Sequence, residues 1–168
     1  MGSYKDLVSQ EGRDKFKELV ESAGMCMFAS NLDSLPISAR PMSTLEVDED
    51  GSLWFFSQAS SDKNYEIKSD SRVQLFYNNT KSSEYLSVAG TAIIIRDEEK
   101  AKELWTAWSK AWFNKGVDDP ELTIIKVVPE DIYYWDTKTN KVVSLLKIAV
   151  GALTGKSMDD GVQGKITV

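Results

Sequence analysis

The chain has 168 residues, 42% hydrophobic and 27% charged, a length and composition typical of one globular domain spanning residues 1–168. Its net charge is −6 and no long Lys/Arg cluster is present, which argues against nucleic acid or an anionic membrane as a partner. The chain has no histidine, which excludes imidazole metal sites, Ser–His and Cys–His nucleophiles and a histidine haem ligand.

The first part of the chain predicts a helix followed by a buried strand. Met1–Ser3 is not followed by an apolar segment, so no secretory signal is expected and the protein is expected to be cytoplasmic. Apolar residues on one face predict a helix over 12–22, and the apolar segment 25–30 predicts a strand. We expect Cys26 in this strand to be a small buried hydrophobe rather than a catalytic thiol. Residues 31–36 predict a turn.

Residues 37–47 and 53–57 predict two strands that pair through a tight turn at 48–51, where Asp-Gly tolerates positive φ. The three acidic side chains of this turn diverge, so we expect them to solvate the hairpin rather than bind a metal. A helix over 61–69 follows, with Ser60 or Ser61 as its N-cap. Its inward-facing residues are expected to be Tyr65, Ile67 and the stem of Lys68.

The middle of the chain predicts two more strands and a helix. Residues 72–77 alternate with period two, and 85–96 form a long β-branched run. Gly90 interrupts that run, which predicts a bulge or a sharp bend at a barrel corner. Asp97 is expected to cap a helix that continues through Trp108 or further.

The last part predicts two strands, 123–128 and 132–135, separated by Pro129. A helical segment at about 144–155 and a polar, loosely held tail over 156–168 complete the chain. About six or seven antiparallel strands with a few helices beside them indicate a mainly β fold, a closed or nearly closed β-barrel with peripheral helices.

Two polar segments are predicted to form an anion site. Arg40 offers a planar fork of donors that suits phosphate, although an isolated arginine on a strand is more often a surface ion pair. Ser61 and Lys63 begin a helix, where free N–H groups attract anions, and they could equally be a cap and a solvated lysine. A flat apolar surface is expected beside them, formed by Met42, Phe55 and Phe56. A phosphorylated aromatic cofactor needs both features.

Two aromatic groups have alternative interpretations. In a strand, Trp54 and Phe56 point to one face and Phe55 to the other, which suits a barrel core. Alternatively, the backbone from Phe55 to Ser57 could border a flat ring, with the Ser57 hydroxyl donating to it or to a phosphate.

A second aromatic group, Trp105, Trp108 and Trp112, falls on one stripe of a predicted helix and indicates core or subunit interface more often than a cofactor site. Trp112 and Phe113 are expected at the exposed end of that helix, as a lid over a neighbour's ligand or as a dimer contact.

Taken together, these segments resemble the flavin-binding split-barrel superfamily that includes pyridoxamine 5′-phosphate oxidase, in particular its bacterial general-stress-protein branch. The resemblance covers nearly the whole chain. It is carried by Ala39–Met42, Leu53–Ser57, Ser61–Lys63, Tyr85–Gly90, Ala111–Phe113, Asp118–Pro120, Tyr134–Asp136 and the tail segments Leu145–Lys147 and Thr154–Lys156.

The resemblance implies a six-stranded antiparallel split barrel of the FMN-binding type, forming a homodimer with one FMN in each of two clefts at the subunit interface. FAD or a deazaflavin remain alternatives to FMN. The arginine, serine and lysine would hold the phosphate, the strand from Arg40 would lie along the ring and ribityl chain, and the aromatic pair would reach in from the partner. The implied cofactor-binding residues are Arg40, Pro41, Met42, Ser43, Phe55, Phe56, Ser57, Ser61, Lys63, Trp112 and Phe113.

The resemblance also implies a flavin-dependent oxidoreductase with a role in stress response, the alternatives being a non-catalytic flavin-binding or sequestering stress protein and a structural dimer with an empty cleft. No catalytic residue stands out, the electron donor and substrate stay open, and Ser43, Tyr77 and Asn79 are candidate polar neighbours of the ring. Pyridoxamine phosphate oxidases use a C-terminal Arg/His element. This chain has no histidine and no arginine after Trp135, so that activity is not expected.

Overall fold

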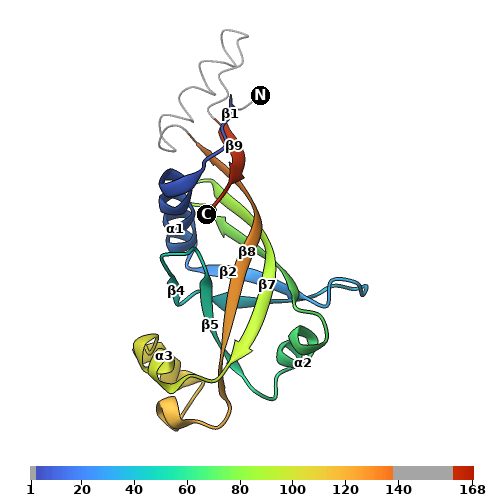
Figure 1. Ribbon diagram of the computed structural model, residues 1–168, viewed down its shortest axis with the longest axis vertical. Coiled ribbons are helices and arrows are strands. Elements are labelled where there is room, and N and C mark those ends of the chain that lie inside the picture. Colours follow the sequence, from blue (N-terminus) through green and yellow to red (C-terminus); the bar gives the residue numbers. More distant parts are fainter. Residues whose placement is uncertain (1–2, 138–160) are drawn as a thin grey trace.

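The computed structural model describes residues 3–137 and 161–168, in which nine strands form one sheet. Its hydrogen-bonded order is β1-β9-β8-β7-β6-β2-β3, with β5 joining β8 to β4 (Figure 1). The strands are β1 Ser3–Tyr4, β2 Met25–Ser30, β3 Ser38–Ser43, β4 Glu46–Val47, β5 Leu53–Gln58, β6 Arg72–Asn79, β7 Glu84–Ile95, β8 Leu122–Thr137 and β9 Gly161–Ile166. The helices are α1 Ser9–Ala23, α2 Asp62–Ser69 and α3 Glu98–Glu103, with 3₁₀ turns η1 Ala107–Ala111 and η2 Gly116–Asp118. The mainly β class is confirmed, and the strands outnumber the six or seven expected because β1, β4 and β9 are additional while β8 replaces two predicted strands.

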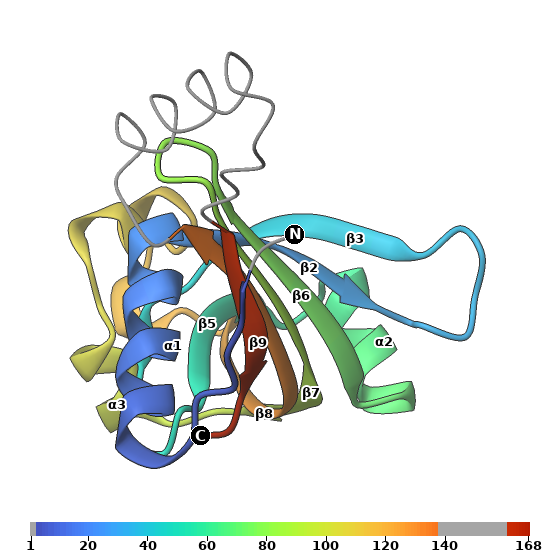
Figure 2. The same cartoon turned by 90° about the horizontal axis from the view of Figure 1, so that it is seen from above.

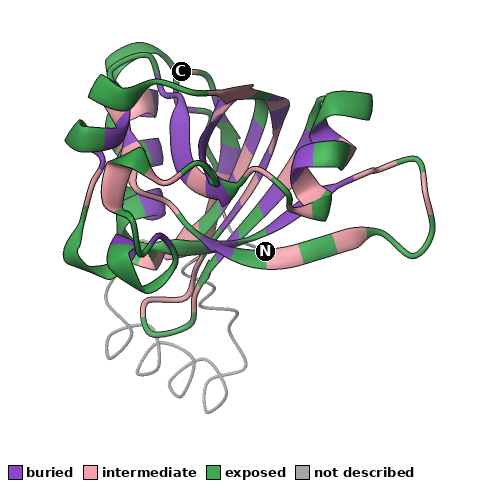
Figure 3. Cartoon of the chain, turned by 90° about the horizontal axis from the view of Figure 1, so that it is seen from below, coloured by how far each residue is buried: buried purple, intermediate pink, exposed green. Residues whose placement is uncertain are grey.

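Helix α1 covers one side of the curved sheet, and α2 lies on another side (Figure 1, Figure 2). The predicted helix over 12–22 is confirmed, and Phe16, Leu19 and Val20 are its buried stripe. It ends at Gly24, whose φ of 67° lets its N–H donate to the Val20 carbonyl. Buried residues fill the interior enclosed by the sheet and the inner face of α1 (Figure 3). No helix in the described parts of the chain is long and apolar enough to cross a membrane.

Strand β3 pairs with β2, not with β5 as the sequence predicted. The β2–β3 ladder runs from Met25 opposite Ser43 to Ser30 opposite Ser38, and this hairpin projects past α2 (Figure 2). The turn at 48–51 does form a hairpin, but it joins the short β4 to β5. The predicted strand over 37–47 is therefore two strands, because the segment after β2 folds straight back on it and leaves only β4 to pair with β5.

Strand β8 is continuous from Leu122 to Thr137, so the two predicted strands on either side of Pro129 are one. The register between β7 and β8 shifts between Ala89 and Gly90, which confirms the irregularity expected at this glycine. A Cβ built on Gly90 would lie 2.3 Å from the Val128 carbonyl oxygen, so a side chain here cannot fit without a backbone shift. Because Gly90 has no side chain, β7 can approach β8 closely where Gly90 lies opposite Pro129, and both strands can bend there.

The helix after Asp97 is shorter than predicted. The Asp97 carboxylate accepts the Lys100 N–H at 2.9 Å, which confirms the cap. The helix ends at Glu103, however, because Thr106 is extended and begins a new 3₁₀ turn with its own capping box to Ser109. The three tryptophans therefore do not share one helix face.

The polar tail is partly a strand. Gly161–Ile166 pairs antiparallel with β8 and parallel with β1, which corrects the expectation of a loosely held segment there. Ile166 is buried, and a Cβ on Gly164 would lie 2.1 Å from the Lys5 carbonyl oxygen, so the two ends of the chain pack backbone to backbone. The helix expected at about 144–155 lies outside the described residues.

Candidate functional site

Arg40 lies on β3 and its guanidinium reaches α2. The side chain is 24% exposed, and its Nη2 atom contacts Glu66 Oε2 at 2.9 Å and donates to Ser38 Oγ at 2.9 Å. Its Nη1 atom donates to Ser30 Oγ. The residues of β3 alternate, so Arg40 shares its face with buried Met42. Arg40 is thus held in a fixed position by groups from β2, β3 and α2.

Lys63 lies three residues before Glu66 on α2, close enough to the Arg40 guanidinium for the two charges to interact. Within residues 3–137 and 161–168, no carboxylate lies within the 4.0 Å of an ion pair from its Nζ atom, whereas Arg40 has Glu66. Burial, followed by the charge of Arg40, lowers the pKa of the Lys63 ammonium below its ordinary value. Two cations therefore act on one region, although β3, which carries Arg40, does not pair with β5 as predicted.

The start of α2 is fixed by a buried polar network. Asn64 accepts a hydrogen bond from Ser57 Oγ at 2.7 Å and donates to Thr123 Oγ1 at 2.9 Å. Thr123 Oγ1 in turn donates to the Ser57 carbonyl oxygen at 2.8 Å. Ser61 occupies the predicted N-cap position, but its hydroxyl donates to the Gln58 carbonyl instead of accepting a helix N–H. This network binds α2 to β5 and β8 and so positions Lys63.

Only part of the predicted packing of α2 holds. Ile67 is 4% exposed, as expected, whereas Tyr65 is 60% exposed and Lys68 is exposed. Lys68 Nζ lies 5.8 Å from the Tyr65 ring centroid on the solvent side. Asn64 and Ile67 form the inward face of the helix because they are three residues apart, and Tyr65 and Lys68 fall on another face.

The aromatic residues of β5 point to opposite faces, as predicted. Phe55 is fully buried in the main core, where its ring meets Phe28 edge-on at 5.5 Å. Its side chain therefore cannot contact a ligand. Trp54 and Phe56 point away from it into a second cluster. Since β4 pairs only with Leu53 and Trp54, the rest of β5 is paired along one edge by β8. Ligand contact by the backbone of Phe55 to Ser57 stays a prediction.

The three residues after Arg40 split between the two faces of β3. Met42 is 9% exposed and belongs to the core, whereas Pro41 and Ser43 lie on the outer face. There they adjoin Met27 and Met25 of β2, which are 45% and 50% exposed. The outer face of the β2–β3 hairpin is therefore apolar and open to solvent in one protomer.

Trp112 and Phe113 are not a pair. Trp112 is 74% exposed, as expected for a lid or an intersubunit contact, and Trp108 is 85% exposed. Phe113 is 2% exposed and packs at 6.0 Å against Phe56 of its own protomer, so it cannot reach into a partner. Phe113 is therefore a core residue and not part of a lid, contrary to the prediction. Its burial fixes the turn on which Trp112 is exposed.

Two of the three candidate polar neighbours of the ring, Tyr77 and Asn79, are engaged elsewhere. The Tyr77 hydroxyl is buried and lies 2.7 Å from Thr44 Oγ1. Asn79 donates to Ser22 Oγ at 2.7 Å and so ties β6 to α1. Cys26 is 2% exposed, and burial raises the pKa of its thiol to about 12, which confirms the hydrophobic interpretation.

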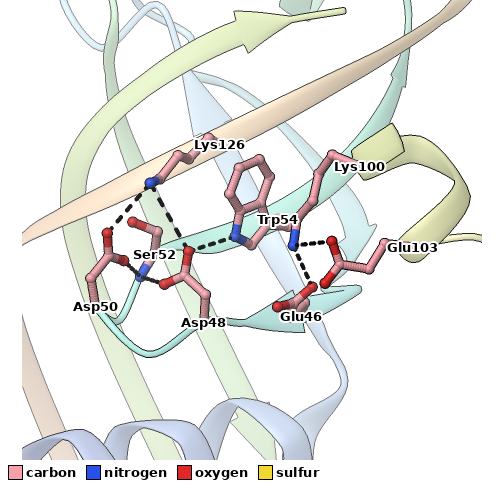
Figure 4. A network of polar contacts seen from close by, with 8 residues as sticks. All are labelled: Glu46, Asp48, Asp50, Ser52, Trp54, Lys100, Glu103 and Lys126. Carbon is pink, nitrogen blue, oxygen red and sulfur yellow. Dashed lines mark hydrogen bonds and ion pairs between the residues drawn. The ribbon is translucent and has the colours of Figure 1, made fainter. Parts of the chain in front are cut away.

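The acidic turn at 48–51 is structural. Asp48 accepts the indole N–H of Trp54 at 2.9 Å, and Lys126 lies 3.4 Å from Asp50 (Figure 4). Lys100 and Lys126 stand 4.7 and 5.2 Å from the Trp54 ring, a cation–π arrangement. The turn therefore orders β4 and β5 and does more than solvate a hairpin. Within the described residues, no group of three or more Cys, Asp or Glu side chains could hold a metal ion.

One hollow of the molecule lies away from Arg40 and Lys63. A cavity of about 890 Å³ lies between α1 and the chain ends. Its two lysines are already paired, Lys5 with Glu11 at 2.5 Å and Lys15 with Asp136 at 2.8 Å. We place the candidate site at Arg40 and Lys63 instead, because a positive charge that no carboxylate in the described part of the chain pairs with indicates an anionic ligand more strongly than volume does.

Comparison with known proteins identifies the family of the chain. Residues 11–159 match the family described as "Pyridoxamine 5'-phosphate oxidase like". The protein bli-3 of Neurospora crassa is 29% identical over 112 residues, 62% of this chain and 54% of that protein. The chain spans about half the length of the curated relatives it matches.

Two solved structures share the fold. One, provisionally named general stress protein 26 from Jannaschia sp. CCS1, has a TM-score of 0.77 at 24% identity and covers 94% of this chain and 98% of that one. The other is the general stress FMN/FAD binding protein from Xanthomonas citri, with a TM-score of 0.67 at 21% identity, covering 79% and 93%.

The cations at the candidate site, the hydroxyls beside them and the open edge of β5 fit a phosphate-bearing ligand that lies along the sheet. The matched segment contains every residue of this arrangement. The chain is thus a member of the pyridoxamine 5′-phosphate oxidase-like family, with a split-barrel fold shared with general stress proteins.

Proposed function

We propose that this protein binds FMN and acts as a flavin-dependent oxidoreductase in a stress response. The observation that carries the proposal is the placement of Lys63 close to Arg40, as a partly buried cation that no carboxylate among the described residues pairs with. A cofactor that ends in a phosphate monoester would supply the missing negative charge. When bound, a flavin supplies hydride or electron transfer, and the protein supplies binding, orientation and exclusion of water.

In this proposal the chain's own residues have separate tasks. Lys63, Arg40 and the Ser61 segment hold the phosphate, and the fixed start of α2 keeps them in place. Pro41, Met42 and Ser43 continue along the same strand toward the ring, with the backbone edge of β5 opposite. The rings of Phe55 and Phe56 pack into separate clusters on opposite faces of β5 and so hold this strand in place.

We propose a homodimer with the flavin at the subunit interface. An apolar outer face supports this, because residues next to one another in the sheet are exposed together. Met27 is opposite Phe76, which is 51% exposed, and Tyr85 is opposite Trp135, which is 41% exposed. A single soluble protomer would leave this face in water. Exposed Trp112 is proposed to reach the flavin held by the other protomer.

The names of the structural neighbours support a stress role, and one of those neighbours is named an FMN/FAD binding protein. FMN is proposed over FAD because a terminal phosphate matches two adjacent cations. The second candidate function is a non-catalytic flavin-binding stress protein. It is favoured by the burial or structural use of two of the three polar side chains considered as neighbours of the ring, Tyr77 and Asn79. The cytoplasmic location stays a proposal from the sequence.

Purified protein tests these functions in one series. Flavin absorbance, with the mass of the released cofactor, is expected to identify FMN, and size-exclusion chromatography is expected to give a dimer. Rapid reduction of the bound flavin by NADH or NADPH, followed by turnover with an acceptor, supports the oxidoreductase. Reduction by dithionite alone supports the non-catalytic alternative. Protein that neither carries nor takes up flavin contradicts the proposal.

A further inference from the structure

We propose that Glu66 competes with the ligand's phosphoryl group for Arg40 and thereby limits how tightly the site holds a phosphate dianion. This inference rests on the proposed function, because it concerns the same site. It assigns to Glu66 a role in setting affinity rather than in contacting the flavin.

The donors of Arg40 are already in use. Nη2 has two N–H groups, and they are directed to Ser38 Oγ and Glu66 Oε2, both at 2.9 Å. Either edge of a guanidinium that can bind phosphate in bidentate fashion includes an N–H of Nη2. A bidentate contact therefore requires Arg40 to release Ser38 or Glu66. Otherwise Arg40 can offer a ligand only single N–H groups, from Nε and Nη1.

The Glu66 carboxylate is fixed by hydrogen bonds from two side chains. Its Oε2 atom also accepts a hydrogen bond from Ser30 Oγ at 2.5 Å, and Ser30 Oγ itself accepts from Arg40 Nη1. The Glu66 side chain is 18% exposed, so water screens its charge only partly. Burial raises the pKa of this carboxyl, but hydrogen bonds from Ser30 and Ser38 and the ion pair with Arg40 outweigh burial, so the pKa lies below its ordinary value. Glu66 is ionised at neutral pH.

Lys63 differs from Arg40 in that Glu66 does not form an ion pair with it. It lies three residues before Glu66 on the same helix, and no ion pair within the described residues holds its ammonium. An incoming phosphate would meet Lys63 directly, and Arg40 only by exchange with a carboxylate. The charges of Asp62 and Glu66 both act on Lys63, and of these two carboxylates Glu66 also pairs with Arg40, so the two cations are largely offset before a dianion arrives. Replacing the Glu66 carboxylate by its neutral amide would keep an acceptor for Arg40 and Ser30 and add a full unit of positive charge.

The test is Glu66→Gln, titrated as apoprotein with FMN and with riboflavin, which lacks the phosphate. FMN is expected to bind about tenfold tighter than to the wild type, with riboflavin unchanged. Glu121→Gln is the matched control, because Glu121 accepts from Ser60 beside α2 without touching Arg40, and its effect is expected to be under about twofold. In an Arg40→Ala background the gain from Glu66→Gln is expected to shrink. Weaker FMN binding, or equal changes for FMN and riboflavin, overturns the proposal.

The rise in melting temperature caused by inorganic phosphate, measured for each variant, shows whether this inference or the proposed function has failed. If the wild type takes up flavin and Glu66→Gln changes nothing, the inference fails and the function stands. If no variant takes up flavin but phosphate stabilises Glu66→Gln more than the wild type, the function fails and the inference stands. Glu66→Asp, whose shorter side chain withdraws from Arg40, serves if Glu66→Gln does not fold, and it is expected to tighten FMN binding in the same direction.

Discussion

Asn64→Ala is predicted to destabilise the protein and to loosen the candidate site together. The Asn64 side chain is buried and joins Ser57 to Thr123 by hydrogen bonds of 2.7 and 2.9 Å. Each such bond contributes about 0.5–1.5 kcal/mol, and buried partners left without it cost about 1–3 kcal/mol more. Ser57 and Thr123 keep other partners, Ser61 Oγ and the Ser57 carbonyl, which favours the lower end of that range. We expect a loss of about 2–3 kcal/mol.

For a chain of this length, the expected loss lowers the melting temperature by about 5–10 °C, measured by circular dichroism. FMN affinity should fall as well, because α2 carries Lys63. Tyr65→Ala is the matched control on the same helix, since that side chain is 60% exposed and its loss should cost under about 0.5 kcal/mol. If Asn64→Ala melts within about 2 °C of Tyr65→Ala, the polar network does not hold α2 and the explanation of the site's rigidity is wrong.

Three further predictions concern the sheet and its charges. Gly90→Ala should lower the melting temperature by several degrees, because its Cβ would lie 2.3 Å from the Val128 carbonyl oxygen; an unchanged melting temperature would show that the strands can separate there. Phe76→Glu on the exposed outer face should give monomers in sedimentation velocity; a dimer that persists would place the interface elsewhere. The pKa of Glu66 is lower in the folded protein than its ordinary value of 4.5, so the ionised carboxylate stabilises the fold at pH values above 4.5. This stabilisation is lost as the pH falls through the lower pKa of the folded state. The melting temperatures of the wild type and Glu66→Gln should therefore converge only at such acid pH values.

Local patterns predicted most of the elements. The strand at 25–30, the Asp97 cap and the irregularity at Gly90 were all predictable, because each depends on residues close together in the chain. The strand that pairs with β3 could not be predicted, because period-two alternation indicates a strand but not which strand lies next to it. The tryptophan spacing extended the predicted helix past Glu103, and the capping box at Thr106 that ends this pattern was overlooked.

The candidate site was predicted in its charged residues and missed in their supports. Arg40 and Lys63 stand in recognisable segments, and the structure brings them together through Glu66. Glu66, Asn64 and Thr123 were missed because their contacts join segments that are 26 to 66 residues apart. One signal was available: asparagine is unfavourable inside a helix, so Asn64 beside Ile67 on an inward face suggested a buried hydrogen-bonding role.

The most direct test of the central claim, that Lys63 and Arg40 hold a phosphoryl group, is isothermal titration of Lys63→Ala, Arg40→Ala and the double variant with FMN and riboflavin. Each single change should weaken FMN about ten- to hundredfold and leave riboflavin affinity unchanged, since each removes one charge-assisted contact to the phosphate. A double variant that binds FMN as tightly as the wild type would contradict the assignment.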